Sequence, residues 1–178
     1  AADGSYSYVA NQDAADALDV GDSVTDSFNY TLSDGTATDI GVIAITILGA
    51  NDNPTAVNDT GYIKEGGTLT VANSAAASSG TSTGNHTGDI TDNDTDADAS
   101  STATITSITA TTAGRSAQTT FSSSSETVSG SYGTLTINSN GSYSYVANSN
   151  ISGLDAGDAN ITDVFTYIVS DGTATSTA

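Results

Sequence analysis

The sequence contains no cysteine, tryptophan or methionine, and Lys64 and Arg115 are its only lysine and arginine. Disulfides therefore cannot hold the fold, and a single histidine without cysteine leaves no visible catalytic triad or zinc site. Two cations are too few for phosphate contacts, which excludes nucleic-acid binding. Asp and Glu number 21, and the formal net charge of −19 indicates a chain that collects cations or stays soluble by self-repulsion.

Long apolar runs are also missing. The longest, at residues 40–48, is interrupted by Gly41 and Thr46, and it is far shorter than the roughly 18 residues that a membrane helix needs. We therefore expect no direct membrane insertion, and the acidic charge also opposes docking on anionic lipid. Hydrophobic residues make up 36% of the chain, so the core will be thin and something besides apolar burial must stabilise it.

The sequence repeats itself after a long interval. DGSYSYV at residues 3–9 returns as NGSYSYV at 140–146, 137 positions later, and SDGTAT at 33–38 returns at 170–175. A period of this length indicates whole domains in tandem. Two domains are therefore predicted: residues 1–50 as the C-terminal part of one repeat, and 51–178 as the next repeat without its final strand.

The absent final strand has two explanations. Either the sequence is a window cut from a longer chain, or a neighbouring copy donates the strand, because an incomplete sandwich exposes an unpaired edge and an apolar slot. Within the second repeat, residues 73–87 are nearly all Ala, Ser, Gly, Thr and Asn, and they are predicted to form a flexible surface insertion.

Short alternating runs of Val, Ile, Leu, Tyr and Phe predict strands throughout the chain. The alternation is clearest at Tyr6 and Tyr8, at Phe28, Tyr30 and Leu32, at Leu69 and Val71, at Ile105 and Ile108, at Leu135 and Ile137, at Tyr143 and Tyr145, and at Phe165, Tyr167 and Val169. Asn-Gly, Asp-Gly and Gly-Gly pairs mark the turns between them, and no helical period is sustained. The predicted fold is all-β, a Greek-key β-sandwich of the immunoglobulin or cadherin-like type, in tandem repeats.

Clustered acidic residues are the most informative feature for function. Five aspartates lie within ten residues, namely Asp89, Asp92, Asp94, Asp96 and Asp98. A second oxygen-rich set lies where the repeats meet and comprises Asn51, Asp52, Asn53, Asp59 and Glu65. Unpaired carboxylates at this density repel one another, and a hard cation with six to eight oxygen ligands removes that repulsion. We predict calcium sites here; the alternative is a solvated acidic loop. Asp171 is a weaker candidate, because an Asp-Gly turn needs no ion.

Two stretches resemble repeats of large bacterial surface adhesins. The first runs from YGTLTIN at 132–138, through NGSY at 140–143, to FTY at 165–167 and SDG at 170–172, and it resembles a VCBS-type repeat. The second is GANDNP at 49–54 followed by NDTDAD at 93–98, and it is similar to a cadherin-like repeat. Together these resemblances cover nearly the whole chain outside the Ser/Ala-rich insertion.

The cadherin-like resemblance implies a ligand set for calcium between domains. It assigns Glu65 as the glutamate near the start of a domain, residues 51–53 as the linker, and Asp94 with Asp96 as the D-x-D loop. Gly49 replaces the first Asp of the linker motif and no D-R-E motif is present. We therefore expect one or two ions per junction.

The resulting hypothesis is an extracellular structural repeat of a cell-surface adhesin, forming a calcium-stiffened rod. Its partners would be neighbouring repeats or copies of itself, and possible further partners are surface glycans or other cells. Three alternatives stay open. One is the subunit of an extracellular filament or sheath held by β-strand exchange between copies. Another is a glycan-binding module, which would need aromatic side chains outside the core. An enzyme is the least favoured, because paired carboxylates alone suit glycoside hydrolysis but no tryptophan offers a sugar platform.

Overall fold

The computed structural model describes residues 3–11, 13–73, 78–81, 84–86, 88–98, 102–111 and 118–178. The chain separates into two compact units, one made of residues 1–52 with 97–100 and the other of 53–96 with 101–178. Apart from the single turn α1 (Asp13–Asp16), all regular elements in the described ranges are strands, and all paired strands are antiparallel. The predicted all-β sandwich class is therefore confirmed.

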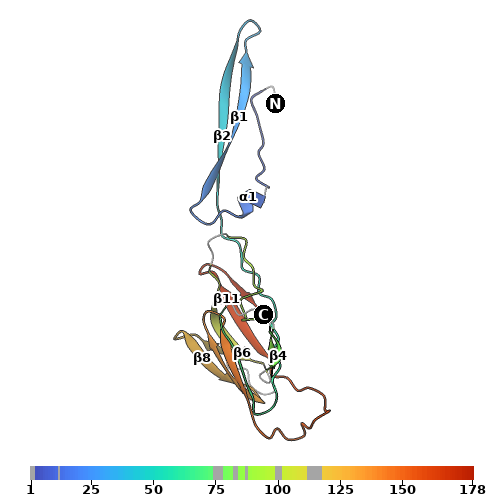
Figure 1. Ribbon diagram of the computed structural model, residues 1–178. Coiled ribbons are helices and arrows are strands. Elements are labelled where there is room, and N and C mark those ends of the chain that lie inside the picture. Colours follow the sequence, from blue (N-terminus) through green and yellow to red (C-terminus); the bar gives the residue numbers. More distant parts are fainter. Residues whose placement is uncertain are drawn as a thin grey trace. The chain divides into compact units, whose positions relative to one another are not determined.

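The first unit is built on one long hairpin, β1 (Ser23–Ser33) and β2 (Thr38–Leu48), which Figure 1 shows in blue and cyan. The pairing runs without interruption from Ser23 opposite Leu48 to Ser33 opposite Thr38. At its tip, Asp34 Oδ1 accepts hydrogen bonds of 2.8 Å from the N–H groups of both Thr36 and Ala37, which fixes the turn.

One predicted strand is wrong. Residues 5–8 alternate Ser and Tyr as a strand would, yet they form no strand in the structure. The same alternation at 143–147 does form a strand in the second unit, because two neighbouring strands there supply backbone partners. The described part of the first unit offers only the β1–β2 sheet, and alternation without pairing does not make a strand.

Two four-stranded sheets form the sandwich of the second unit. One has the order β3-β10-β9-β8 and the other β12-β11-β6-β7. Their strands are β3 (Thr68–Val71), β6 (Thr104–Ala110), β7 (Gln118–Thr120), β8 (Ser125–Ser129), β9 (Gly133–Asn138), β10 (Tyr143–Ala147), β11 (Phe165–Ser170) and β12 (Thr175–Thr177). In the predicted insertion at 73–87, β4 (Ser78–Thr81) pairs with β5 (Gly84–His86), while residues 74–77, 82–83 and 87 lie outside the described residues.

The core lies between these two sheets. Alternate residues of β9 are buried, as period-two patterning requires, and both sheets contribute apolar side chains. The most deeply buried are Val71, Ile105, Ile108, Ile137 and Val169. Ile105 and Ile108 are three residues apart and still share the core face, because β6 contains a bulge. Ile168 pairs with Ser107 whereas Val169 pairs with Ile105, so one extra residue is inserted between them.

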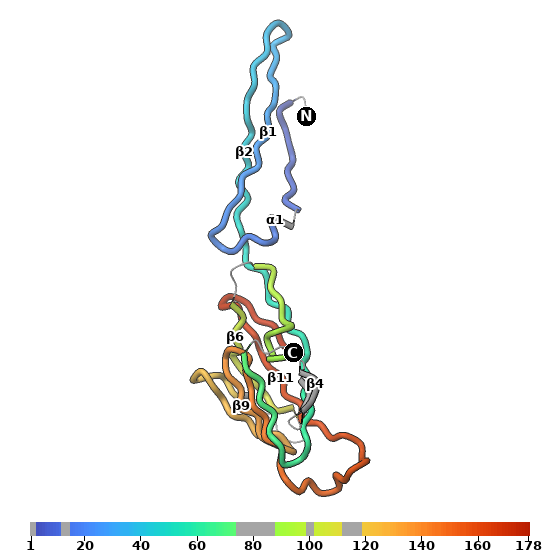
Figure 2. Tube along the Cα trace, in the orientation of Figure 1, coloured from blue at the N-terminus to red at the C-terminus, as the bar shows by residue number. Residues whose placement is uncertain are grey.

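A long loop at residues 148–164, orange to red in Figure 2, is fixed to the sandwich by Asp163. Its Oδ1 accepts a 2.7 Å hydrogen bond from the N–H of Ser131, and its Oδ2 accepts bonds from the N–H of Tyr132 at 3.0 Å and from the hydroxyl of Tyr145 at 2.6 Å. Burial and this bond raise the pKa of Tyr145, which keeps its hydroxyl a donor. The Tyr145 ring also meets Phe165 edge to face at 6.2 Å.

The first unit repeats this arrangement at the same 137-residue offset. Tyr8 donates to Asp26 Oδ2 and meets Phe28 edge to face at 6.1 Å. The tip of β1–β2 is likewise reproduced by β11–β12, where Asp171 Oδ1 accepts from the N–H groups of Thr173 and Ala174 at 2.6 Å each. The two units therefore share contacts as well as sequence.

Replacing Asp163 with Asn should destabilise the second unit by about 1–3 kcal/mol, because an amide NH₂ would face one of three donors and leave it unsatisfied. Urea unfolding followed by tyrosine fluorescence measures the loss. Asp155→Asn is the matched control, since it removes the same charge from an exposed position of the same loop. Equal losses in the two variants would contradict this role for Asp163.

Tyr143 predicts how stability depends on alkaline pH. Burial, with the nearby charges of Asp59 and Asp89, raises its pKa from 10.0 to about 12. The unfolded chain then loses this proton at lower pH than the folded chain, so the contribution to stability is complete below pH 10 and disappears as pH rises toward 12. Chemical unfolding across this range should show a decline that Tyr143→Phe reduces and Tyr6→Phe, at a 66% exposed site, leaves unchanged.

Candidate functional site

Residues 55–57 of the second unit lie against the acidic loop that contains Asp94. Thr55 and Thr95 form an antiparallel bridge, with hydrogen bonds of 2.7 Å from the N–H of Thr55 and 3.1 Å from the N–H of Thr95. Two residues further on, the N–H of Val57 donates to Asp94 Oδ1 at 2.8 Å. Backbone pairing thus brings the two predicted acidic segments together, although they are distant in sequence.

The hydroxyl of Tyr167 lies at the centre of this arrangement. Its ring belongs to β11 and is buried in the core, and the hydroxyl donates to the carbonyl oxygen of Val57 at 2.9 Å. The hydroxyl oxygen of Tyr167 also lies 3.1 Å from Asp94 Oδ1 and 3.4 Å from Asp59 Oδ2. A phenol has one proton to donate, so two carboxylates and a carbonyl compete for one donor.

Burial makes this site unfavourable for negative charge. It raises the pKa of Asp94, and the charge of Asp89 adds to the rise, while hydrogen bonds from Val57 and Tyr167 partly oppose it. Burial also raises the pKa of Tyr167, and the charges of Asp94 and Asp59 raise it further. A bound cation would oppose the rise in the pKa of Asp94, because it stabilises the ionised carboxylates.

Asn93 adds a further oxygen to the same region. Its Nδ2 donates to Asp59 Oδ1 at 3.2 Å and to the carbonyl of Asn58 at 3.4 Å. Its Oδ1 is buried and accepts no hydrogen bond within the described residues. A buried oxygen without a donor is costly unless something else satisfies it, and amide, carboxylate and carbonyl oxygens are the ligands that calcium takes. The donor set therefore fits a calcium ion.

The beginning of the acidic loop is ordered by its own carboxylates. Asp89 is fully buried, and its Oδ1 accepts from both the N–H and the hydroxyl of Thr91 at 2.8 Å. Asp92 Oδ2 accepts from the N–H of Asp89 at 3.2 Å. The loop packs so closely on Gly141, whose φ is +89°, that a Cβ there would come within 2.8 Å of Asp89 Oδ1. The Asn-Gly turn thus allows the loop to approach.

The remaining predicted ligands are distributed over several places. In the first unit, Asp98 is buried and its Oδ2 accepts from the N–H of Asp52 at 2.9 Å, and Asn51 Nδ2 donates to the carbonyl of Asp52. Asn53 is exposed, and Asp96 is half-buried in the second unit. Two further carboxylates stabilise loops: Glu65 Oε2 accepts from the N–H of Ile151 at 3.1 Å, and Asp171 holds the β11–β12 turn.

The structure thus brings Asp59 and Asp94 together with Tyr167. In the part of the chain that it describes, no three acidic or histidine side chains converge as a metal-binding group. The sequence did not single out Asn93 or Tyr167 as site residues, nor Asp163 as the residue that fixes the long loop. For Asp163 a signal was present, because Tyr8, Asp26 and Phe28 recur together 137 residues later as Tyr145, Asp163 and Phe165. The other two are neutral side chains, which an acidic pattern does not reveal.

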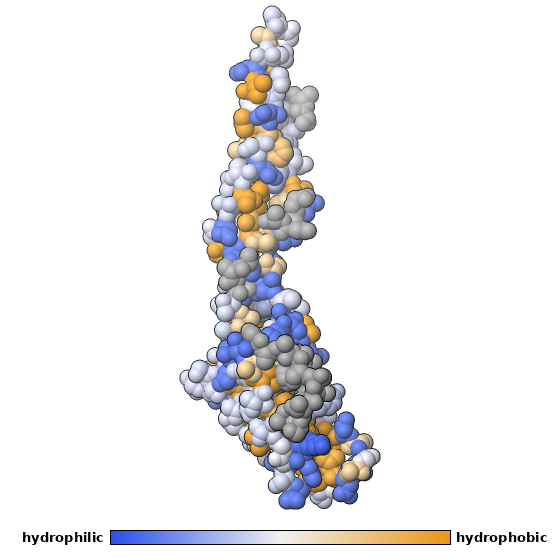
Figure 3. All heavy atoms as spheres, viewed as in Figure 1, coloured by the Kyte–Doolittle hydropathy of each residue, from blue (hydrophilic) through white to orange (hydrophobic). Residues whose placement is uncertain are grey.

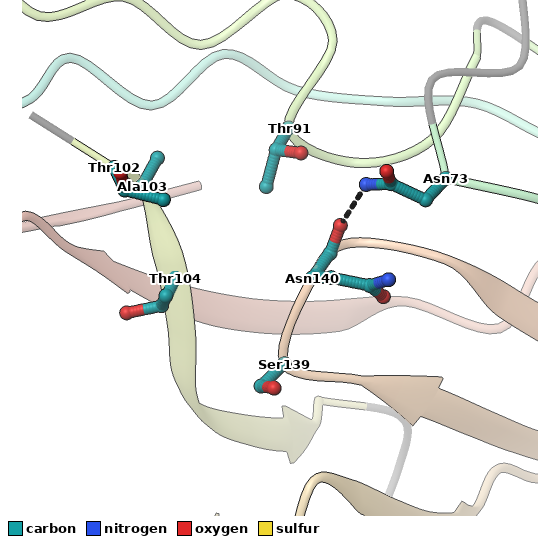
Figure 4. A pocket seen from close by; sticks show the side chains of 7 residues that line it. All are labelled: Asn73, Thr91, Thr102, Ala103, Thr104, Ser139 and Asn140. Carbon is teal, nitrogen blue, oxygen red and sulfur yellow. Dashed lines mark hydrogen bonds between the residues drawn. The ribbon is translucent and has the colours of Figure 1, made fainter.

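A pocket of about 420 Å³ lies elsewhere in the second unit. Asn73 Nδ2 closes one side of it by donating to the carbonyl of Asn140 at 2.6 Å, as Figure 4 shows. Thr91, Thr104 and Ser139 are among its lining residues, and no residue of the lining is ionisable. This pocket therefore offers hydroxyls and amides but no acid or base.

Comparison with known proteins gives one family. The model of the bacterial cadherin-like domain matches residues 51–178, while no curated protein matches the sequence significantly. Domains of this family are structural or adhesive, are typically extracellular or at the cell surface, and generally bind Ca²⁺. Among the described residues, no helix is long and apolar enough to cross a membrane. With its antiparallel sandwich and its matching second unit, the chain belongs to the bacterial cadherin-like domain family.

Proposed function

We propose that this chain is an extracellular structural repeat of a cell-surface adhesin, and that calcium ions bound by its acidic loops stabilise it. The family supports the adhesive and extracellular part of the proposal. The calcium part is supported by one observation above all: Asp59, Asp94 and the carbonyl of Val57 are gathered around the Tyr167 hydroxyl, where burial raises the pKa of Asp94.

The residues that would hold the ion in the second unit are Asp94 and Asp59, assisted by the carbonyl of Val57 and by Asn93 Oδ1. Calcium would supply positive charge where the protein has only donors of hydrogen bonds. Lys64 and Arg115 are the only lysine and arginine against 21 acidic residues, so internal ion pairs cannot neutralise the loops. An external divalent cation is the remaining means of relieving the repulsion.

The location of the protein, inside or outside the cell, would control whether calcium occupies these sites. Extracellular calcium is millimolar, and sites of extracellular modules bind with dissociation constants on the order of 10⁻⁴ to 10⁻³ M. Such sites fill outside the cell and stay empty in the cytosol, so the repeat would reach full stability only after export.

Ions bound where successive repeats join, at residues such as Asn51, Asp52 and Asn53, would stiffen a rod of repeats. The rod would act mainly as a spacer, in contact with neighbouring repeats or copies and, at its tip, with glycans or other cells.

Thermal unfolding in calcium, magnesium and chelator tests the calcium site. At a tenfold excess of calcium over the dissociation constant, each ion bound only by the folded state adds about 1.4 kcal/mol. We expect a rise in Tm of several degrees in millimolar calcium relative to chelator, and a smaller rise in magnesium, which demands a stricter octahedral geometry.

A double variant, Asp94→Asn with Asp96→Asn, should remove the second unit's share of the calcium-dependent rise and leave the Tm in chelator nearly unchanged. The matched control, Asp16→Asn with Asp22→Asn, removes two exposed charges from the first unit and should retain the rise. Equal loss of Tm in calcium and in chelator would show that these aspartates stabilise the fold without an ion and would refute the assignment.

A further inference from the structure

The hydroxyl of Tyr167 has a fixed position, whereas the oxygens around it belong to loops. Tyr167 lies in β11, opposite Ile108 of β6, and both are interior strands of their sheet. Its side chain is 4% exposed, so the ring cannot leave the core without opening the close-packed sandwich. Val57, Asp59 and Asp94 lie outside the strands. Any opening or closing of the site is therefore a movement of these segments toward or away from a fixed hydroxyl.

The hydroxyl occupies the point at which two carboxylates approach the same atom. Asp94 reaches it with both oxygens, at 3.1 Å from Oδ1 and 3.5 Å from Oδ2, and Asp59 Oδ2 lies 3.4 Å away. Like charges this close repel one another, and the phenol places the positive end of an O–H dipole between them. A cation bound here would serve the same purpose.

Two further donors to these carboxylates are neutral as well. The N–H of Val57 donates to Asp94 Oδ1 at 2.8 Å, and Asn93 Nδ2 donates to Asp59 Oδ1 at 3.2 Å. The Asn93 bond is made while its own Oδ1 stays buried without a hydrogen bond in the described part of the chain. In the absence of an ion, the site is therefore held together by dipoles where a charge is needed.

Water cannot fully replace these donors, because the site is partly enclosed. Asp59 and Asp94 are half-buried. Elsewhere on the second unit, the face drawn in Figure 3 is mostly hydrophilic or near-neutral, with apolar residues in small patches, and carboxylates on such a surface are solvated. Removal of the Tyr167 hydroxyl would instead leave partly desolvated acceptors without a donor, which destabilises the closed site.

The hydroxyl and a calcium ion serve the same oxygens, so each reduces what the other contributes. An ion beside Asp94 and Asp59 takes their lone pairs and compensates their charge. A hydrogen bond from Tyr167 to these carboxylates then gains less than it does in the ion-free state. The hydroxyl therefore stabilises the ion-free state more than the ion-bound state.

We propose that the hydroxyl of Tyr167 takes the place of calcium in the ion-free chain and holds the acidic loop closed on the core. This role rests on the calcium site proposed above and adds its regulation. By the reciprocity of linked equilibria, the hydroxyl weakens calcium binding and limits the loss of stability when calcium is removed. The second unit then stays folded at low calcium.

The variant Tyr167→Phe, which keeps the ring and removes the hydroxyl, tests this role in the full chain. Thermal unfolding is followed in chelator and across a calcium titration. We expect a Tm several degrees below that of the parent in chelator, a smaller loss in saturating calcium, and hence a larger calcium-dependent rise than the parent shows. The apparent Kd for calcium should fall by roughly three- to tenfold.

Tyr145→Phe is the matched control. It also removes a phenol hydroxyl that donates to a carboxylate, at 2.6 Å to Asp163 Oδ2, but it leaves Asp59 and Asp94 with their donors. We expect it to lower the Tm equally in calcium and in chelator, so that the calcium-dependent rise stays that of the parent.

Amide hydrogen exchange locates the effect. The N–H groups of Thr55, Val57 and Thr95 bind the acidic loop to residues 55–57. In chelator they should exchange faster in Tyr167→Phe than in the parent, and calcium should restore their protection. A variant that folds only in calcium also supports the role, because it shows that the ion replaces the hydroxyl.

The opposing outcomes separate this role from the calcium site itself. If the parent gains stability in calcium but Tyr167→Phe loses equally in calcium and chelator, the hydroxyl is an ordinary core contact and only the present role is refuted. If Tyr167→Phe binds calcium more weakly, the hydroxyl is a ligand of the ion and does not replace it. A parent without any calcium-dependent rise refutes the proposed calcium site, and the exchange between hydroxyl and ion with it.

Discussion

The hydroxyl of Tyr167 connects the apolar core of the second unit to its acidic loop. Its ring fills the core between two sheets that have few large apolar side chains, and its oxygen meets Val57, Asp94 and Asp59. The acidic loop is therefore positioned by the core, and the core is closed by the loop. The pKa of Asp94 is raised because this closure takes a carboxylate out of water. A fold with so few apolar side chains depends on hydrogen-bond partners for its buried oxygen atoms as much as on the burial of apolar surface.

The same dependence explains the recurring pairing of tyrosine with aspartate. Tyr145 of β10 donates to Asp163 in the loop that precedes β11, and Tyr8 donates to Asp26 of β1. A tyrosine places a large ring in the core and one donor at its margin, so it suits a chain without tryptophan and with few aliphatic residues. Proposed calcium binding addresses the deficit that remains, which is the excess of carboxylates over lysine and arginine.

Several features were accessible from sequence because they depend on local chemistry. Period-two alternation at Leu135 and Ile137 predicts β9, and the Asp-Gly pairs at Asp34 and Asp171 predict hairpin turns that the structure shows. Other features depend on partners that no local pattern specifies. Tyr6 and Tyr8 alternate as Tyr143 and Tyr145 do, yet only the second pair lies in a strand, because only there do neighbouring strands bond to the backbone. The β6 bulge, which lets Ile105 and Ile108 share a face, is equally invisible to a periodicity of two.

The sequence by itself determined the all-β class, the family, the excess of carboxylates and the 137-residue repeat, since each is a property of composition or order along the chain. Tertiary structure decided which carboxylates meet. It placed Asp94 with Asp59, held Asp52 to Asp98, and assigned Glu65 and Asp171 to loops. It also decided that residues 160–165 border an apolar groove. The physical reason is that spacing in sequence sets which groups are near in the chain, whereas long-range strand pairing sets which groups are near in space.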